Sequence, residues 1–352
     1  MRTSLFLLLS TLAAAASIPQ QVPFSDDSVT SDTKPIPNPR PLVIWHGLGD
    51  TAHSDGIDEF IGIVRTRYPG IYVHSIVAPL NSGPSEEQRA GWWGKAERLA
   101  EDQCAELESI PELQNGYDAM GFSQGGLFLR YIAQYCEHGD RMRNLITFGT
   151  PHYGINALIP CPDPPTLMCK LAYNAARAGV YTAFAQRRLI QAQYYRDVDR
   201  LDEFLTLNTF LRDLNAEGIL DDDGEPTGRE HGGRGLDKLE NLIAVNFLND
   251  TTVFPARSSQ WATLAPEEED PDAEAKTLED VGTMDVLEKR RVILLKDQPL
   301  YEQDWIGLKT LDKKKRLHLV DCEGQHMQLG GEGGCADKLL DKWVGWDQKE
   351  KQ

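Results

Sequence analysis

Short, largely apolar runs recur along the chain, and each is followed by a turn that contains glycine, asparagine or aspartate. They cover residues 41–45, 117–120, 242–248 and 317–320. Runs of this kind indicate parallel strands whose two faces are both covered. Helices are predicted at residues 127–133 and 338–344. The pattern therefore predicts an α/β fold, with a mostly parallel central sheet and helices on both faces.

Residues 155–235 interrupt this alternation of strands and helices. Within them, residues 171–190 and 198–214 have helical character, so we expect a helical cap inserted between two core strands. An acidic, proline-bounded run at about 264–282 predicts a solvated surface loop. The expected core is a single domain over residues 41–346.

The N-terminal 17 residues have the pattern of a secretory signal peptide. Arg2 precedes the apolar run 5–9, and small residues occupy positions 13–17. Residues 18–40 follow as a proline-rich extended leader, which suits neither a helix nor a central strand. No apolar stretch reaches the roughly 18 residues that span a membrane. We therefore expect a protein of the secretory pathway, in the lumen of a lysosome or vacuole, or outside the cell.

The net charge and the absence of certain motifs limit the classes of partner and cofactor to be expected. The formal net charge of −18 argues against nucleic acid and against electrostatic attraction to anionic membranes. Metal-ligand spacings such as C-x-x-C or H-E-x-x-H do not occur, so neither a metal nor an organic cofactor is expected. A monomer is assumed, since the sequence does not address the oligomeric state.

The clearest chemical signal is the run Gly-Phe-Ser-Gln-Gly-Gly at residues 121–126, which matches the nucleophile-elbow pattern G-x-S-x-G. A predicted strand precedes it and a predicted helix follows it, which is the order that such a turn requires. We predict that Ser123 is a nucleophile exposed on a tight strand-to-helix turn. The amide of the next residue, Gln124, would form half of an oxyanion hole.

A nucleophilic serine needs a histidine base and an orienting acid, which follow it in the chain in this fold. Of the eight histidines, His326 alone lies in a glycine-containing loop directly after a late apolar strand. Asp250 follows the strong strand 242–248, which is the position expected of the acid. Asp321 competes, but it lies too close to His326 in sequence. Asp285 competes as well, but it follows no strand. We therefore predict a Ser123–His326–Asp250 triad.

Several further segments, taken with the elbow, resemble the palmitoyl-protein thioesterase family. They are the runs at residues 46–50, 117–126, 191–195, 247–250 and 323–329. The family has an α/β-hydrolase fold, is lysosomal or secreted, and removes long fatty acyl groups from cysteine thioesters. The resemblance implies the same triad and an oxyanion hole formed by the backbone amides of Leu48 and Gln124. It also implies S-acylated proteins or peptides as substrates.

The cysteines and one sequon complete the expectations. Six cysteines allow fifteen pairings. The resemblance implies Cys104–Cys136 and Cys161–Cys169, which leaves Cys322–Cys335 as the third pair. Asn249 belongs to the chain's N-x-S/T sequon, Asn-Asp-Thr at residues 249–251. Because neighbouring side chains of an extended segment point to opposite sides, Asn249 can carry a glycan while Asp250 faces the site.

Three other functions remain open at this point. A lipase or carboxylester hydrolase, or an acyl-CoA thioesterase, would use the same triad, and a non-catalytic lipid carrier could keep the fold. The residues that would form the walls of an acyl groove are also not assigned. Aromatic residues of the predicted cap are candidates, but core packing explains them equally well: Phe184, Tyr194, Tyr195 and Phe204.

Overall fold

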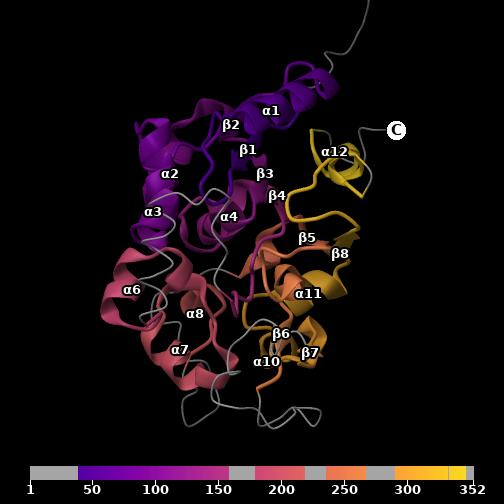
Figure 1. The fold of residues 1–352 in the computed structure, drawn as a ribbon. Coiled ribbons are helices and arrows are strands. Elements are labelled where there is room, and N and C mark those ends of the chain that lie inside the picture. The colour runs from indigo at the N-terminus through magenta and orange to yellow at the C-terminus, as the bar shows by residue number, and fades with distance from the viewer. Residues whose placement is uncertain (1–38, 158–178, 219–234, 267–289, 332, 346–352) are drawn as a thin grey trace, which may run out of the picture. The chain divides into compact units, whose positions relative to one another are not determined.

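The centre of the structure is a six-stranded parallel sheet (Figure 1). The computed structural model describes residues 39–157, 179–218, 235–266, 290–331 and 333–345. The strand order is β2 (Val73–Ser75), β1 (Leu42–Trp45), β3 (Tyr117–Phe122), β4 (Met142–Phe148), β5 (Asn241–Phe247) and β8 (Leu317–Cys322). The predicted parallel sheet is confirmed. The four expected strands correspond to β1, β3, β5 and β8.

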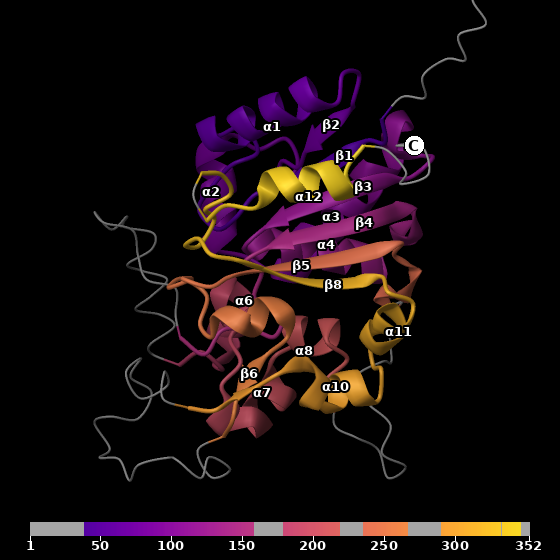
Figure 2. The same ribbon diagram turned by 90° about the vertical axis from the view of Figure 1, so that its right-hand side faces the viewer.

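Helices cover both faces of the sheet. Alternate strand residues point to opposite sides, so the apolar residues of each strand pack on helices of both faces. Leu42 and Ile44 of β1 pack in one apolar cluster with α1 (Asp55–Arg67) and α12 (Ala336–Trp343). Val43 and Trp45 pack in the other with α3 (Ala96–Ser109) and α4 (Gln124–Tyr135). Figure 2 shows α12 in front of the strands and α3 and α4 behind them. α2 (Pro84–Trp92) lies between β2 and α3 in the chain.

The disulfide Cys104–Cys136 is present as expected, and it joins α3 to the residue that ends α4. The predicted pair Cys161–Cys169 lies outside the described residues, as do the signal peptide, nearly all of the leader and most of the acidic run. Residue 264, where that run was expected to begin, instead belongs to strand β6 (Thr263–Leu264). This strand pairs with β7 (Val292–Ile293) in a small antiparallel sheet.

Between β4 and β5, the described residues 179–218 contain three short α-helices. They are α6 (Ala183–Arg188), α7 (Leu201–Leu207) and α8 (Phe210–Leu214). The single helix predicted over 198–214 is wrong because Asn208 interrupts it. The backbone of Asn208 is extended, and its side-chain oxygen accepts from the amides of Leu211 and Arg212 at the start of α8. Beyond β7 lie α10 (Pro299–Glu302) and α11 (Leu308–Lys313).

A buried arginine attaches this helical segment to the helix that follows the predicted nucleophile. Arg130 of α4 is fully buried and donates to the carbonyls of His152 and Leu214 and to the side chain of Asn215. Leu214 ends α8, so the cation meets the negative end of that helix. Burial lowers the pKa of Arg130 to about 9. The contacts place the end of α8 against α4.

Asp118 lies near the start of β3, at the end opposite Ser123. Its side chain is fully buried and accepts from Arg40 at 2.8 Å and from Asn144 at 2.9 Å. Burial raises its pKa to about 6, although Arg40 acts in the opposite direction. Between about pH 4 and pH 6 the unfolded chain therefore loses this proton while the folded chain keeps it. The stability that the protonated group contributes is present below about pH 4 and is lost as the pH rises through about 6.

We expect Asp118→Asn to flatten the dependence of Tm on pH across this interval. Relative to the variant, the wild type should lose on the order of 5 °C between pH 4 and pH 7. Thermal unfolding of both proteins in matched buffers measures this difference. Two parallel curves would show that the pKa of Asp118 is the same in the folded and unfolded chains.

Candidate active site

Ser123 occupies a backbone conformation that only a constrained turn maintains. It lies between β3 and α4 with φ 51° and ψ −122°, a conformation that is rare for residues with a side chain. The surrounding glycines are required by close packing. A Cβ at Gly125 would lie 2.4 Å from the carbonyl oxygens of Trp45 and His46, and one at Gly121 would lie 2.4 Å from the Cα of Gly126. The predicted strand–turn–helix elbow is therefore present.

The structure brings the three predicted triad side chains together. The Nε2 atom of His326 lies 3.0 Å from the Oγ of Ser123, and its Nδ1 lies 2.7 Å from the Oδ2 of Asp250. Because a carboxylate oxygen accepts, Nδ1 is the nitrogen that carries hydrogen, and Nε2 is free to accept from the serine hydroxyl. The side chain of Asp250 is 1% exposed and that of His326 is 14% exposed. The geometry allows proton transfer from Ser123 to His326.

The turn after β5 holds the Asp250 carboxylate in place. Its Oδ1 accepts from the amides of Thr252 at 2.8 Å and Val253 at 2.9 Å, while Oδ2 faces His326. Both oxygens are thus hydrogen-bonded, which fixes the orientation of the carboxyl group toward His326.

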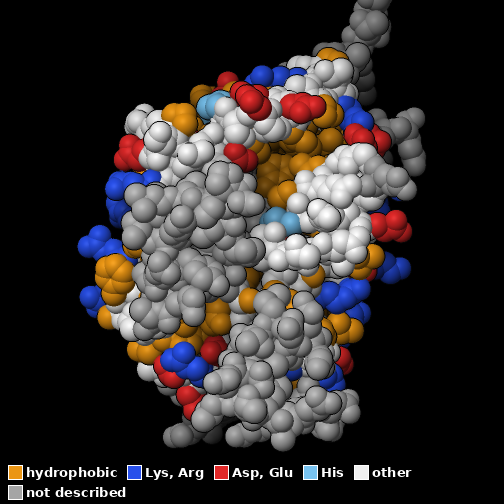
Figure 3. All heavy atoms as spheres, in the orientation of Figure 1, with side chains coloured by type: hydrophobic (Ala, Val, Ile, Leu, Met, Phe, Trp, Pro, Cys, Tyr) orange, Lys and Arg blue, Asp and Glu red, His pale blue; other side chains and the backbone are white. Residues whose placement is uncertain are grey.

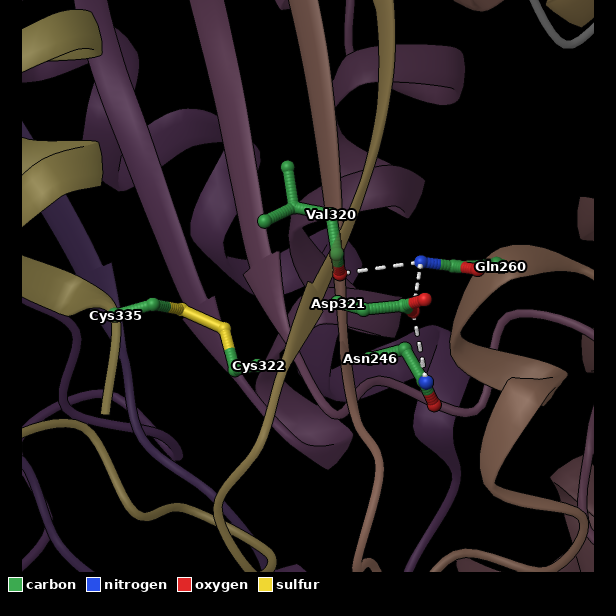
Figure 4. Close-up of a disulfide and its surroundings, with 6 residues drawn as sticks. All are labelled: Asn246, Gln260, Val320, Asp321, Cys322 and Cys335. Atoms are coloured by element: carbon green, nitrogen blue, oxygen red, sulfur yellow. Dashed lines mark hydrogen bonds between the residues drawn. A yellow bond between two sulfur atoms is a disulfide. The ribbon is translucent and has the colours of Figure 1, made fainter. Parts of the chain in front are cut away.

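The rejected competitor Asp321 points away from this relay. Its side chain accepts from Asn246 at 3.0 Å and Gln260 at 3.1 Å (Figure 4). It also pairs with Arg257 at 3.2 Å. These contacts connect β8 to β5 and to the 3₁₀ turn Ala256–Gln260, which follows the Asp250 turn. Asp285 lies outside the described residues.

The disulfide Cys322–Cys335 is present and closes the loop that carries His326. Figure 4 shows the bridge on one side of β8 and the Asp321 network on the other. Inside the loop, the amide of Gly324 donates to the carbonyl of Gly333 at 3.0 Å. The amide of Asn249 also donates to the carbonyl of Gly324, so the loops that bear the acid and the base are joined directly.

Gln124 and Gly47, the residue that precedes Leu48, lie beside Ser123. Gln124 is the first residue of α4, where backbone N–H groups have no partner within the helix. Leu48 follows Gly47, and a Cβ at Gly47 would lie 3.3 Å from the Cβ of Ser123. The β1–α1 loop therefore contacts the elbow at the position where the second donor is expected.

A cavity of about 690 Å³ opens at Ser123 and His326. Figure 3 shows a hollow lined by hydrophobic side chains, with a histidine at its border. The apolar lining comes from α1, α2, β3 and the loops after β1 and β8: Leu48, Ile57, Phe60, Trp92, Phe122, Met327 and Leu329. The cap aromatics considered from the sequence do not line it. Tyr194 and Phe204 are fully buried in the core, and Phe184 is exposed.

Two of the other described histidines, His152 and His318, have structural surroundings. His152 is buried, stacks on Trp261, and contacts Thr147 through Nε2 at 2.8 Å. Burial and the nearby Arg130 cation lower its pKa well below the usual value. His318 of β8 packs on Trp343 at the sheet edge. Within the described ranges, no group of three or more His, Cys, Asp or Glu side chains is arranged to hold a metal ion.

Two features of the site were not anticipated from the sequence. The Oγ1 atom of Thr150 donates to the carbonyl of Ser123 at 2.8 Å, and its side chain fills the space above Gly126. Helix α2 forms one wall of the cavity through Ser85, Gln88, Arg89 and Trp92. The spacing of these four positions is that of one helix face. It does not indicate that this helix lies beside Ser123.

A parallel sheet with a serine on the turn after β3, an acid after β5 and a histidine after β8 defines the chain as an α/β-hydrolase. A family model described as palmitoyl protein thioesterase matches residues 41–326, and the chain belongs to this family.

Several curated proteins are similar over most of the chain. Palmitoyl-protein thioesterase 1 of Caenorhabditis elegans is 31% identical over 290 residues, which are 82% of this chain and 87% of that protein. A palmitoyl-protein thioesterase-dolichyl pyrophosphate phosphatase fusion of Schizosaccharomyces pombe is 33% identical over 312 residues, 88% of this chain but 44% of the fusion. Lysosomal thioesterase PPT2-B of Xenopus laevis is 22% identical over 316 residues, 87% of this chain and 92% of that protein.

We expect Gly125→Ala to disrupt the elbow, because the new methyl group would meet two backbone oxygens that cannot move independently. The loss of unfolding free energy should be about 1–3 kcal/mol or more, with loss of serine reactivity. The matched control is Gly62→Ala in α1, where a Cβ meets nothing within 4 Å. That change should stabilise the protein by up to about 1 kcal/mol. Denaturant unfolding and fluorophosphonate labelling measure both effects, and equal behaviour of the two variants would contradict this account of the turn.

Proposed function

We propose that the protein hydrolyses long-chain S-acyl cysteine thioesters, such as palmitoyl-cysteine in modified proteins or peptides, through an acyl-serine intermediate. The observation that carries the proposal is the hydrogen-bonded relay from Asp250 through His326 to Ser123, which opens into an apolar cavity. Membership of the palmitoyl protein thioesterase family supports the substrate class.

In the acylation step, the Oγ of Ser123 attacks the thioester carbonyl while the Nε2 of His326 takes its proton. Asp250 stabilises the imidazolium through Nδ1. The amides of Leu48 and Gln124 stabilise the tetrahedral oxyanion, a contribution on the order of 3 kcal/mol for each donor. The carbon–sulfur bond then breaks, and His326 returns its proton to the thiolate. This leaving group departs readily, since the pKa of a cysteine thiol is about 8.5.

Deacylation uses the same groups in a second attack. His326 takes a proton from a water molecule as that water adds to the acyl carbonyl. Collapse of the intermediate breaks the bond to the Oγ of Ser123, which receives the proton from His326. The products are the fatty acid and the regenerated serine.

The cavity supports a long acyl chain as the bound group. Its apolar lining begins beside Ser123 and extends along α1, where Ile57 and Phe60 face it. A volume of about 690 Å³ lies within the range of small-molecule pockets. Each buried methylene contributes up to about 0.8 kcal/mol, so a fully enclosed chain gains affinity with every carbon.

We place the protein in the secretory pathway, in a lysosomal or vacuolar lumen or outside the cell. The signal-peptide pattern of residues 1–17 supports this, together with the two disulfides of the described residues. A similar protein is named as lysosomal. Among the described residues, no helix combines the length and the apolar character needed to cross a membrane. Asn249 is the proposed glycan acceptor: the residue is exposed, and its side-chain nitrogen donates to the carbonyl of Glu323.

We expect purified protein to release thiol from a palmitoyl-cysteine peptide, and Ser123→Ala to lower this rate by about 10⁴-fold or more. A matched palmitoyl oxygen ester assayed in parallel separates a thioesterase from a lipase or carboxylester hydrolase. Hydrolysis of the ester with a comparable or higher kcat/KM would contradict the thioester assignment. Background rates on both substrates would favour the non-catalytic carrier.

The cavity predicts a dependence on acyl chain length. We expect kcat/KM to rise by at most about 15-fold for every two methylenes until the cavity is filled. Gly56→Leu should remove this dependence for long chains, because Gly56 lines the cavity and faces open space. Short-chain thioesters should be cleaved as before.

Gly62→Leu is the matched control for this experiment. It places the same side chain on the same helix, in open space outside the cavity lining. If both variants retain the wild-type preference for chain length, the acyl chain does not occupy this cavity.

A further inference from the structure

A buried carboxylate of helix α2 is not used by the catalytic steps above. Glu87 is 3% exposed and lies beneath the loop that joins β1 to α1. Its Oε2 accepts from the amide of Ala52 at 3.1 Å and lies 3.5 Å from the Nε2 of His46. His46 begins this loop and Ala52 lies near its end, so one carboxylate contacts both sides of the segment that carries Leu48.

The second contact brings the Glu87 carboxylate to within 3.5 Å of a ring nitrogen of His46. The Nδ1 of His46 lies 2.9 Å from the carbonyl oxygen of Gly47, which only accepts, so Nδ1 carries hydrogen. Burial alone would raise the pKa of Glu87, but the contacts with His46 and the Ala52 amide outweigh burial and hold the pKa below its usual value.

The loop held in this way is the one that touches the nucleophile. A Cβ at Gly47 would lie 3.3 Å from Ser123, and one at Gly91, one helical turn beyond Glu87, would lie 3.3 Å from the amide nitrogen of Gly49. Glu87 and Gly91 therefore present one face of α2 to the loop. Gly91 also accepts from the side chain of Gln124, whose amide is the other oxyanion donor.

We propose that Glu87 is a positioning residue for the oxyanion hole: by tying His46 and Ala52 to α2, it holds the Leu48 amide opposite Ser123. The inference rests on the proposed function. It concerns the stabilisation of the tetrahedral intermediate and not the binding of the acyl chain, because Glu87 does not line the cavity.

The test compares Glu87→Ala with wild type on a palmitoyl thioester and on a palmitoyl-chain trifluoromethyl ketone. The Oγ of Ser123 adds to the ketone carbonyl, its proton goes to His326, and the resulting oxyanion probes the hole. We expect kcat to fall about 10- to 100-fold and the affinity for the ketone to fall in parallel, with KM changed by less than about threefold. Glu86→Ala, its exposed neighbour on α2, should change none of these.

Glu87→Gln distinguishes positioning from general destabilisation. Its amide oxygen can accept from Ala52 and its NH₂ group can donate to the Nε2 of a neutral His46, so we expect it to restore most of kcat. Should Glu87→Ala fail to fold, His46→Asn keeps a donor toward the Gly47 carbonyl and removes the contact with Glu87. It should show the same loss in kcat and ketone affinity.

Three results would overturn the proposal. They are an unchanged kcat in folded Glu87→Ala, a rise in KM with kcat and ketone affinity preserved, and a loss in Glu87→Gln as large as that in Glu87→Ala. The rate of fluorophosphonate labelling of Ser123 separates this outcome from failure of the proposed function. If wild type is labelled but does not cleave the thioester, the proposed substrate is wrong. The role of Glu87 is then tested by comparing the labelling rates of wild type and Glu87→Ala.

Discussion

The parallel register of the central sheet is the constraint on which the rest of the structure depends. All six strands run in the same direction, so their carboxyl ends meet at one edge. Phe122 pairs with Phe148, and Phe247 pairs with Cys322, which brings the turns after β3, β5 and β8 together. Asp250 and His326 are 76 residues apart, and Ser123 and His326 are 203 apart, yet both pairs are within hydrogen-bonding distance. Local sequence preferences could not bring residues so far apart in the chain into contact.

Close packing at the elbow converts this arrangement into a reactive geometry. Gly121, Gly125 and Gly126 let the start of α4 approach β1 and Thr150, and that approach holds the strained backbone of Ser123. The acid and base loops are joined by backbone hydrogen bonds, and the Cys322–Cys335 bridge closes the base loop. The site is therefore held by the sheet edge itself. On the substrate side, α2 has two roles, since one face lines the cavity and another packs on the β1–α1 loop.

Features that reside in a short stretch of chain could be predicted from the sequence. The elbow, the four expected strands and the positions of Asp250 and His326 each have a local pattern of apolar runs ending in polar turns. The cavity walls could not be predicted in this way, because Phe60, Trp92 and Met327 come from three distant segments and meet only through the tertiary fold. The helix predicted over 198–214 failed because the side chain of Asn208 caps a new helix instead of continuing the first. Strand β4 was not predicted because Arg143, Asn144 and Thr147 interrupt its apolar residues.

The central claim is that hydrolysis passes through an ester on Ser123. Its most direct test is rapid acid quenching of the enzyme during turnover of a palmitoyl thioester, followed by mass spectrometry of the intact protein and its peptides. The account predicts a transient addition of one palmitoyl group, located on the peptide that contains Ser123 and absent from Ser123→Ala. Turnover without any acylated enzyme, or an acyl group on another residue, would contradict it.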